Sequence, residues 1–143
     1  MFGWGVGDII AISQLALKVH LAYKDAPDTY RHISKEVRSL QIIINKTIQH
    51  FEGTALSEND RQEGQEVLEG CQGVLEDLNS LIEEYDSLAS ANKHQVLKRI
   101  KLSTEDISTL RARLISNTVL LNSFIQRFDI STITIVYDRY ANI

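Results

Sequence analysis

The segment YRHISKEVRSLQIIINKTIQHF, residues 30–51, gives the clearest indication of the fold class of this chain. Its apolar residues recur at steps of three and four, the spacing that places side chains on one face of an α-helix. The members of this face are Tyr30, Ile33, Val37, Leu40, Ile44, Thr47 or Ile48, and Phe51. Because Glu52-Gly53-Thr54 ends the pattern, we expect one long amphipathic helix that buries this face against other helices.

The same periodicity predicts three further main helices. The first runs from Asp8 to about Tyr23 and ends at the break Asp25-Ala-Pro27. Ser57 and Ser103, each followed three residues later by an aspartate, are typical of helix starts. After Ser57 the predicted apolar face consists of Val67, Cys71, Val74, Leu78, Leu81, Tyr85 and Leu88. After Ser103 it consists of Ile107, Leu110, Leu114, Thr118, Leu121, Ile125 and Phe128.

These helices define the predicted fold class and domain organisation. Short connections between long helices favour antiparallel neighbours, so we expect an all-α, antiparallel up-and-down bundle of four main helices over residues 1–128. A short extra helix is expected around Val96, Leu97 and Ile100. Residues 129–143, DISTITIVYDRYANI, fit both strand and helix spacing. We favour a helical tail or linker there, because a bundle offers an isolated strand no sheet to join.

Composition limits the classes of function. The 143 residues form one domain, and 43% hydrophobic with 24% charged residues is typical of a globular protein. The net charge of −4 argues against nucleic acid as a partner, since phosphate binding requires a surplus of lysine and arginine. The single cysteine, Cys71, cannot form an internal disulfide, which favours a reducing cytosol.

Charge is distributed unevenly between the last two main helices. From Ser57 to Tyr85 the charged residues are almost all acidic, whereas from Lys93 to Arg113 they are mainly basic, so these helices are expected to pack as neighbours. A basic cluster within the second segment consists of Lys93, Lys98, Arg99 and Lys101. Contact with anionic lipid is an alternative for this cluster, although pairing with the acidic helix is favoured.

The sequence contains no recognisable constellation for chemistry. The four histidines, His20, His32, His50 and His94, lack the i,i+4 partners and neighbouring cysteines of metal sites, so we interpret them as structural. Cys71 lies on a predicted apolar face, where a small core residue is favoured over a nucleophile. The chain also lacks a nucleophile elbow and a phosphate-loop lysine. We therefore expect no enzyme activity, metal, cofactor, nucleic acid or small-molecule substrate.

The N-terminus, MFGWGVGDII, places Gly3, Gly5 and Gly7 on alternate residues. No strand can precede them and Asp8 occupies the position of a third glycine, so this is not a dinucleotide-binding fingerprint. Polar residues interrupt the following apolar run, and Phe2 occupies the position that myristoylation requires as glycine, so targeting signals do not fit either. We interpret residues 1–7 as a glycine-rich leader before a helix over residues 8–23.

This first helix has an unusual distribution of apolar residues. From Phe2 to Tyr23 it would extend about 33 Å, close to the hydrocarbon thickness of a bilayer. On a helical projection Asp8, Ala11, Gln14 and Lys18 share one narrow face. Most of the remaining surface is formed by Ile9, Ile10, Ile12, Leu17, Val19 and Leu21. A single copy should stay out of lipid because of Asp8 and Lys18, whereas a ring of copies could turn the polar stripe toward a wet lumen. The alternative is the central apolar helix of the bundle.

Three segments resemble a known family. They are FGWGVGDIIAISQLALKVHLAYKDAP at the start, YRHISKEVRSLQ after it, and LISNTVLLNSFIQRF near the end. Together they resemble the HeLo-like N-terminal domains of fungal STAND and NLR-type receptors, which are related to the HeLo domain of the HET-S incompatibility protein. The resemblance covers about residues 2–128 and is strongest in the glycine-plus-aspartate start and in Tyr30, Glu36 and Leu40.

The resemblance implies a function in heterokaryon incompatibility, programmed cell death and innate immunity. On this view the bundle is cytoplasmic at rest, homo-oligomerises under an NLR-type receptor, and releases its N-terminal helix into the lipids of the plasma membrane as a pore-forming effector. The membrane-inserting residues would be Phe2, Gly3, Trp4, Gly5, Gly7, Asp8, Ile9, Ile10, Ile12, Leu17 and Lys18. The alternative is a non-lytic adaptor that only oligomerises or docks a signalling partner, with the first helix as permanent core.

Overall fold

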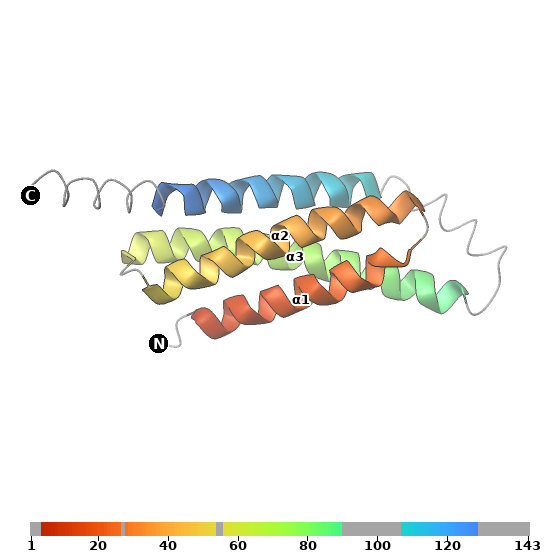
Figure 1. The fold of residues 1–143 in the computed structure, drawn as a ribbon, viewed down its shortest axis with the longest axis horizontal. Coiled ribbons are helices and arrows are strands. Elements are labelled where there is room, and N and C mark those ends of the chain that lie inside the picture. Colours follow the sequence, from red (N-terminus) through yellow and green to blue (C-terminus); the bar gives the residue numbers. More distant parts are fainter. Residues whose placement is uncertain (1–3, 27, 54–55, 90–106, 129–143) are drawn as a thin grey trace, which may run out of the picture.

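In the computed structural model the chain folds as an all-α bundle (Figure 1). The structure describes residues 4–26, 28–53, 56–89 and 107–128. Three helices are α1 (Val6–Lys24), α2 (Asp28–Gly53) and α3 (Glu58–Ala89), and the fourth covers residues 107–128. These ranges contain no strand. The predicted fold class is therefore confirmed, while the expected extra helix near Val96 and the 129–143 tail lie outside the described residues.

Successive helices run in opposite directions, and α1 and the 107–128 helix lie along opposite edges of the bundle (Figure 1). α1 packs against both α2 and α3. The 107–128 helix also touches both, through an Arg111–Glu36 ion pair to α2 and an Arg113–Asp77 ion pair to α3. Because α1 and α3 run in the same direction, the chain combines antiparallel hairpins with a parallel α1–α3 pair.

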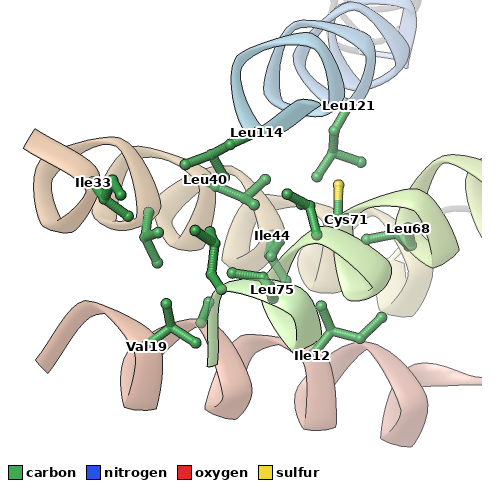
Figure 2. Packing of buried hydrophobic residues seen from close by; sticks show 14 of the residues in the cluster. Ile12, Val19, Ile33, Leu40, Ile44, Leu68, Cys71, Leu75, Leu114 and Leu121 are labelled. Carbon is green, nitrogen blue, oxygen red and sulfur yellow. The ribbon is translucent and has the colours of Figure 1, made fainter. Parts of the chain in front are cut away.

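The core is continuous between all four helices (Figure 2). The predicted buried face of α2 is confirmed. Of the two alternative members near its end, Thr47 is fully buried and Ile48 is half-buried. The α3 face differs from the prediction: Val67, Leu81 and Tyr85 are only half-buried. The fully or almost fully buried α3 residues include Leu68, Leu75 and Ile82, which the predicted face omitted.

Two glycines in α3 allow the 107–128 helix to approach closely. A Cβ atom at Gly64 would lie 2.9 Å from the Phe124 ring, and one at Gly70 would lie 2.5 Å from Asn117 Oδ1. At Gly73, by contrast, the nearest atom, on Arg113, would be 3.8 Å away. Glycine destabilises an isolated helix by about 1 kcal/mol relative to alanine, but it is favoured at Gly64, because a larger residue would displace the Phe51 and Phe124 rings. At Gly70 a larger residue would displace only the end of the Asn117 side chain.

Charge complementarity between α3 and the 107–128 helix is confirmed in part for the described residues, because Arg113 and Arg127 pair with α3 whereas Arg111 pairs with Glu36 of α2. Arg113 Nη1 lies 2.7 Å from Asp77, and Arg127 Nη2 lies 2.8 Å from Glu63 and 3.4 Å from Asp60. These pairs are largely exposed, so they select the neighbour more than they stabilise the fold. The basic cluster from Lys93 to Lys101 lies outside the described residues.

Candidate functional site: the first helix and its contacts

The start of α1 differs from the predicted leader. The helix begins at Val6, and Asp8 caps it from inside the first turn by accepting a hydrogen bond from the Gly5 N–H at 2.8 Å. Trp4 and Val6 are half-buried against the core, and Gly7 is helical. The prediction of a leader is therefore wrong for residues 4–7, which form the N-terminal cap and the start of the first helical turn. Deleting residues 1–7 would remove the contacts of Trp4 and Val6 with the core. Phe2 and Gly3 lie outside the described residues.

The apolar surface of α1 is divided between the core and solvent. One face is buried between α2 and α3, as Ile12 and Val19 show in Figure 2. It consists of Ile9, Ile12, Ala16, Val19 and Tyr23. Ile9, Ile12 and Val19, which the membrane interpretation assigns to the lipid-facing surface of an oligomer, are therefore buried in the folded bundle. Burial of large apolar side chains stabilises by roughly 1.5–3 kcal/mol each, so this face holds α1 in place.

The opposite side of α1 exposes large apolar residues to solvent. Ile10 is 40% exposed, Leu17 is 42% exposed and Leu21 is 51% exposed. The predicted polar stripe of Asp8, Ala11, Gln14 and Lys18 is also exposed. α1 is therefore apolar on its inner face and along an outer line, which is unusual for a helix at the edge of a bundle.

Polar contacts join α1 to α2 along its length. Ser13 Oγ donates a hydrogen bond to Asn45 Oδ1 at 2.6 Å. Two turns further on, the His20 ring lies 2.9 Å from Ser34 Oγ, and the same hydroxyl donates to the His20 carbonyl at 3.0 Å. His20 is thus structural, as expected, and these contacts fix the register of the two helices.

The C-terminal end of α1 is held by an aromatic cluster. The Tyr23 hydroxyl donates a 2.7 Å hydrogen bond to the Leu78 carbonyl of α3. Its ring contacts Tyr30 of α2 with centroids 6.3 Å apart, and Tyr30 contacts Tyr85 of α3 at 5.9 Å. Burial raises the pKa of Tyr23, and the nearby Tyr30 hydroxyl raises it further by a smaller amount. No sequence pattern predicted this cluster, because its members come from three helices.

Tyr23→Phe should lower the melting temperature by a few degrees, because it removes one buried hydrogen bond worth about 1 kcal/mol and keeps the ring contacts. Thermal unfolding followed by circular dichroism measures the change. A melting temperature equal to that of the parent would show that the hydroxyl does not stabilise α1 against α3.

The chemistry available in the described residues is limited. No group of three or more His, Cys, Asp or Glu side chains in this part of the chain could hold a metal ion. Cys71 is fully buried, and burial raises the pKa of its thiol to about 12. Such a thiol is a core residue rather than a nucleophile, because the thiolate is the reactive form.

We predict that Cys71 does not react with a thiol reagent in the folded protein and reacts completely in denaturant, because only unfolding exposes it and restores an ordinary pKa. Colour release from a chromogenic disulfide at neutral pH measures this. Rapid labelling of the folded protein would contradict the burial of Cys71.

Length and composition distinguish α1 from the other described helices. It is the one helix in the described ranges long and apolar enough to cross a membrane, and the buried core helix of a soluble protein meets the same criterion. Its geometry is therefore compatible with two states, packed in the bundle or spanning lipid. Comparison with family models, curated proteins and solved structures finds no match to this chain.

Proposed function

We propose that this protein is a membrane-permeabilising effector domain whose α1 leaves the bundle when copies of the chain are brought together. The observation that carries the proposal is the outer line of Ile10, Leu17 and Leu21 on a helix that already buries its inner face. In water this line contributes little packing within the chain, whereas in a bilayer it would lie against lipid. The resemblance to HeLo-like domains supports the same function.

Release has an energetic cost that explains the need for a trigger. Four large buried side chains of α1, Ile9, Ile12, Val19 and Tyr23, stabilise the packed state by roughly 6–12 kcal/mol in total. Asp8 and Lys18 add the cost of charge in lipid. A single copy therefore stays folded and cytoplasmic. Only an oligomer in which the polar stripes of several copies line a water-filled pore offsets these costs. An NLR-type receptor or another scaffold at the plasma membrane would supply the oligomer.

The alternative function is a non-lytic adaptor in which α1 never leaves the bundle. The contacts that favour it are the hydrogen bonds from α1 to both neighbours, Ser13 to Asn45 and Tyr23 to Leu78. In that case the outer line would bind a protein rather than lipid. Neither function involves an enzyme reaction, a cofactor, a nucleic acid or a small-molecule substrate.

Dye release from anionic liposomes separates the two functions. The full chain is fused to a domain that oligomerises on addition of a small ligand, and leakage is recorded before and after the ligand is added. The effector function predicts leakage only after oligomerisation. Oligomerisation without leakage, with the bundle still folded by circular dichroism, would support the adaptor.

A further inference from the structure

The outer line of α1 has the spacing of a coiled-coil seam. Ile10, Gln14, Leu17 and Leu21 follow one another at steps of four, three and four, and we call these four residues the outer seam. All four are exposed, although three of them are large and apolar. In parallel two-stranded coiled coils a single polar residue within such a seam fixes register and strand number. Gln14 occupies that kind of position.

Opposite charges flank the outer seam on its two sides. On α2, the exposed charged residues from position 31 to position 46 are Arg31, Lys35, Arg38 and Lys46. On α3, the neighbouring edge carries Glu69, Glu76 and Glu83 at intervals of seven residues. Each carboxylate accepts a hydrogen bond from a side-chain amide one helical turn earlier. The donors are Gln65, Gln72 and Asn79, at 3.0, 3.0 and 3.1 Å respectively. Within the described residues, no cation pairs with Glu69 or Glu76.

We propose that the outer seam of α1 is the centre of a parallel, two-fold symmetric interface with a second copy of this chain. A two-fold axis parallel to α1 brings the outer seams of the two copies into contact. It also places the basic α2 of each copy opposite the acidic α3 of the other. An antiparallel pair would instead place α2 against α2 and α3 against α3. Charge therefore selects the parallel arrangement, and the interface is self-complementary as a closed dimer requires.

The helix register identifies one pair of charges that would meet. Asn45 lies level with Ser13, and Ser34 lies level with His20, so Arg38 lies between them at about the level of Lys18. Glu83 is at the same level, because its carboxylate is 3.7 Å from Lys18 Nζ. Under the proposed symmetry Arg38 of one copy faces Glu83 of the other, twice in each dimer.

The area of the interface fits a reversible dimer. α1 is about 28 Å long, and adding half of each neighbouring helix gives a face about 20 Å wide. Two such faces would bury about 1,100 Å², close to the lower limit of stable interfaces at about 1,200 Å². The dimer covers the outer seam in the resting protein and does not require membrane activity, so its failure would leave the leakage experiment unaffected.

Charge exchange between two variants tests the interface. Arg38→Glu and Glu83→Arg each create two like-charged contacts, so each variant alone should dimerise about tenfold more weakly than the parent by sedimentation equilibrium. A mixture of the two variants restores both contacts with opposite charge, so their heterodimer should form about as well as the parent dimer. The double variant Arg38→Glu/Glu83→Arg should also recover. Circular dichroism confirms that each variant is folded.

Matched controls separate this interface from bulk charge and from other surfaces. Arg61→Glu and Glu66→Arg, at exposed positions of α3 that are not among the charged residues flanking the outer seam, are mixed in the same way and should give no preferential heterodimer. Gln14→Lys should weaken the parent dimer, whereas Val119→Lys on the opposite edge should not. A monomer at all concentrations, or a mixture of Arg38→Glu and Glu83→Arg no more associated than either alone, would overturn the proposal.

Discussion

Leu40→Asp should unfold the bundle at ordinary temperature. Leu40 is completely buried at the centre of α2, beside Leu114 in the core (Figure 2). The substitution removes a large apolar side chain and places an unpaired carboxylate among apolar side chains, which costs about 4 kcal/mol or more. A domain of this size is stable by about 5–15 kcal/mol, so most of its stability would be lost.

The matched control for this prediction is Ile42→Asp, two residues away on the same helix. Ile42 is 44% exposed, so its carboxylate would remain solvated and the melting temperature should change little. Thermal unfolding of both variants by circular dichroism gives the comparison. If Leu40→Asp melts within about 2 °C of the parent, the core has been assigned wrongly.

Leu17→Lys should abolish membrane leakage by the oligomerised protein while leaving the bundle folded. Leu17 is exposed in the bundle of a single chain, so a lysine there costs the fold little, although it would weaken the dimer proposed above. In a membrane-spanning helix the same lysine costs about 3 kcal/mol per copy, and an oligomer multiplies this cost by its number of chains. This position is a better test site than Ile12, because Ile12 is buried and a lysine there would disrupt the fold itself.

Val119→Lys is the control for Leu17→Lys. Val119 is 58% exposed on the 107–128 helix, at the edge of the bundle opposite α1. It adds the same charge to a similarly exposed apolar position but not to the helix proposed to enter lipid. Dye release unaffected by Val119→Lys and lost with Leu17→Lys would support the proposal, whereas leakage from Leu17→Lys equal to that of the parent would contradict insertion of the outer line of α1 into lipid.

The sequence predicts α2 well because its two sides differ strongly in polarity. The buried face of Leu40 and its neighbours alternates with charged residues such as Lys35 and Arg38, so only one orientation buries apolar surface. α3 is predicted less well, because it packs against α1 on one side and the 107–128 helix on the other. Its apolar surface is correspondingly wide, and three- and four-residue steps fit Val67 and Leu81 as readily as Leu68 and Leu75.

The orientation of α1 could not be predicted from its sequence. Apolar residues occur on nearly all sides of this helix, so periodicity does not distinguish Ile12, which is buried, from Leu17, which is exposed. Contacts to the other helices determine which face of α1 is buried, in particular the hydrogen bonds of Tyr23 with Leu78 and of Ser13 with Asn45. Such pairs are far apart in sequence and leave no local signal.

The most direct measurement of α1 release is a reversible crosslink between α1 and α2. The side chains of Ser13 and Asn45 meet at 2.6 Å, and the chain's single cysteine is buried, so Ser13→Cys/Asn45→Cys introduces one accessible thiol pair. A short, cleavable thiol crosslinker then ties the two helices together. A matched crosslink between Asp77→Cys and Arg113→Cys joins α3 to the 107–128 helix without restraining α1.

The measurement is dye release from anionic liposomes after forced oligomerisation, before and after cleavage of each crosslink. If α1 enters the membrane, the Ser13–Asn45 crosslink blocks leakage, cleavage restores it, and the Asp77–Arg113 crosslink leaves leakage unchanged. Full leakage from protein in which α1 remains tied to α2 would contradict the release of α1.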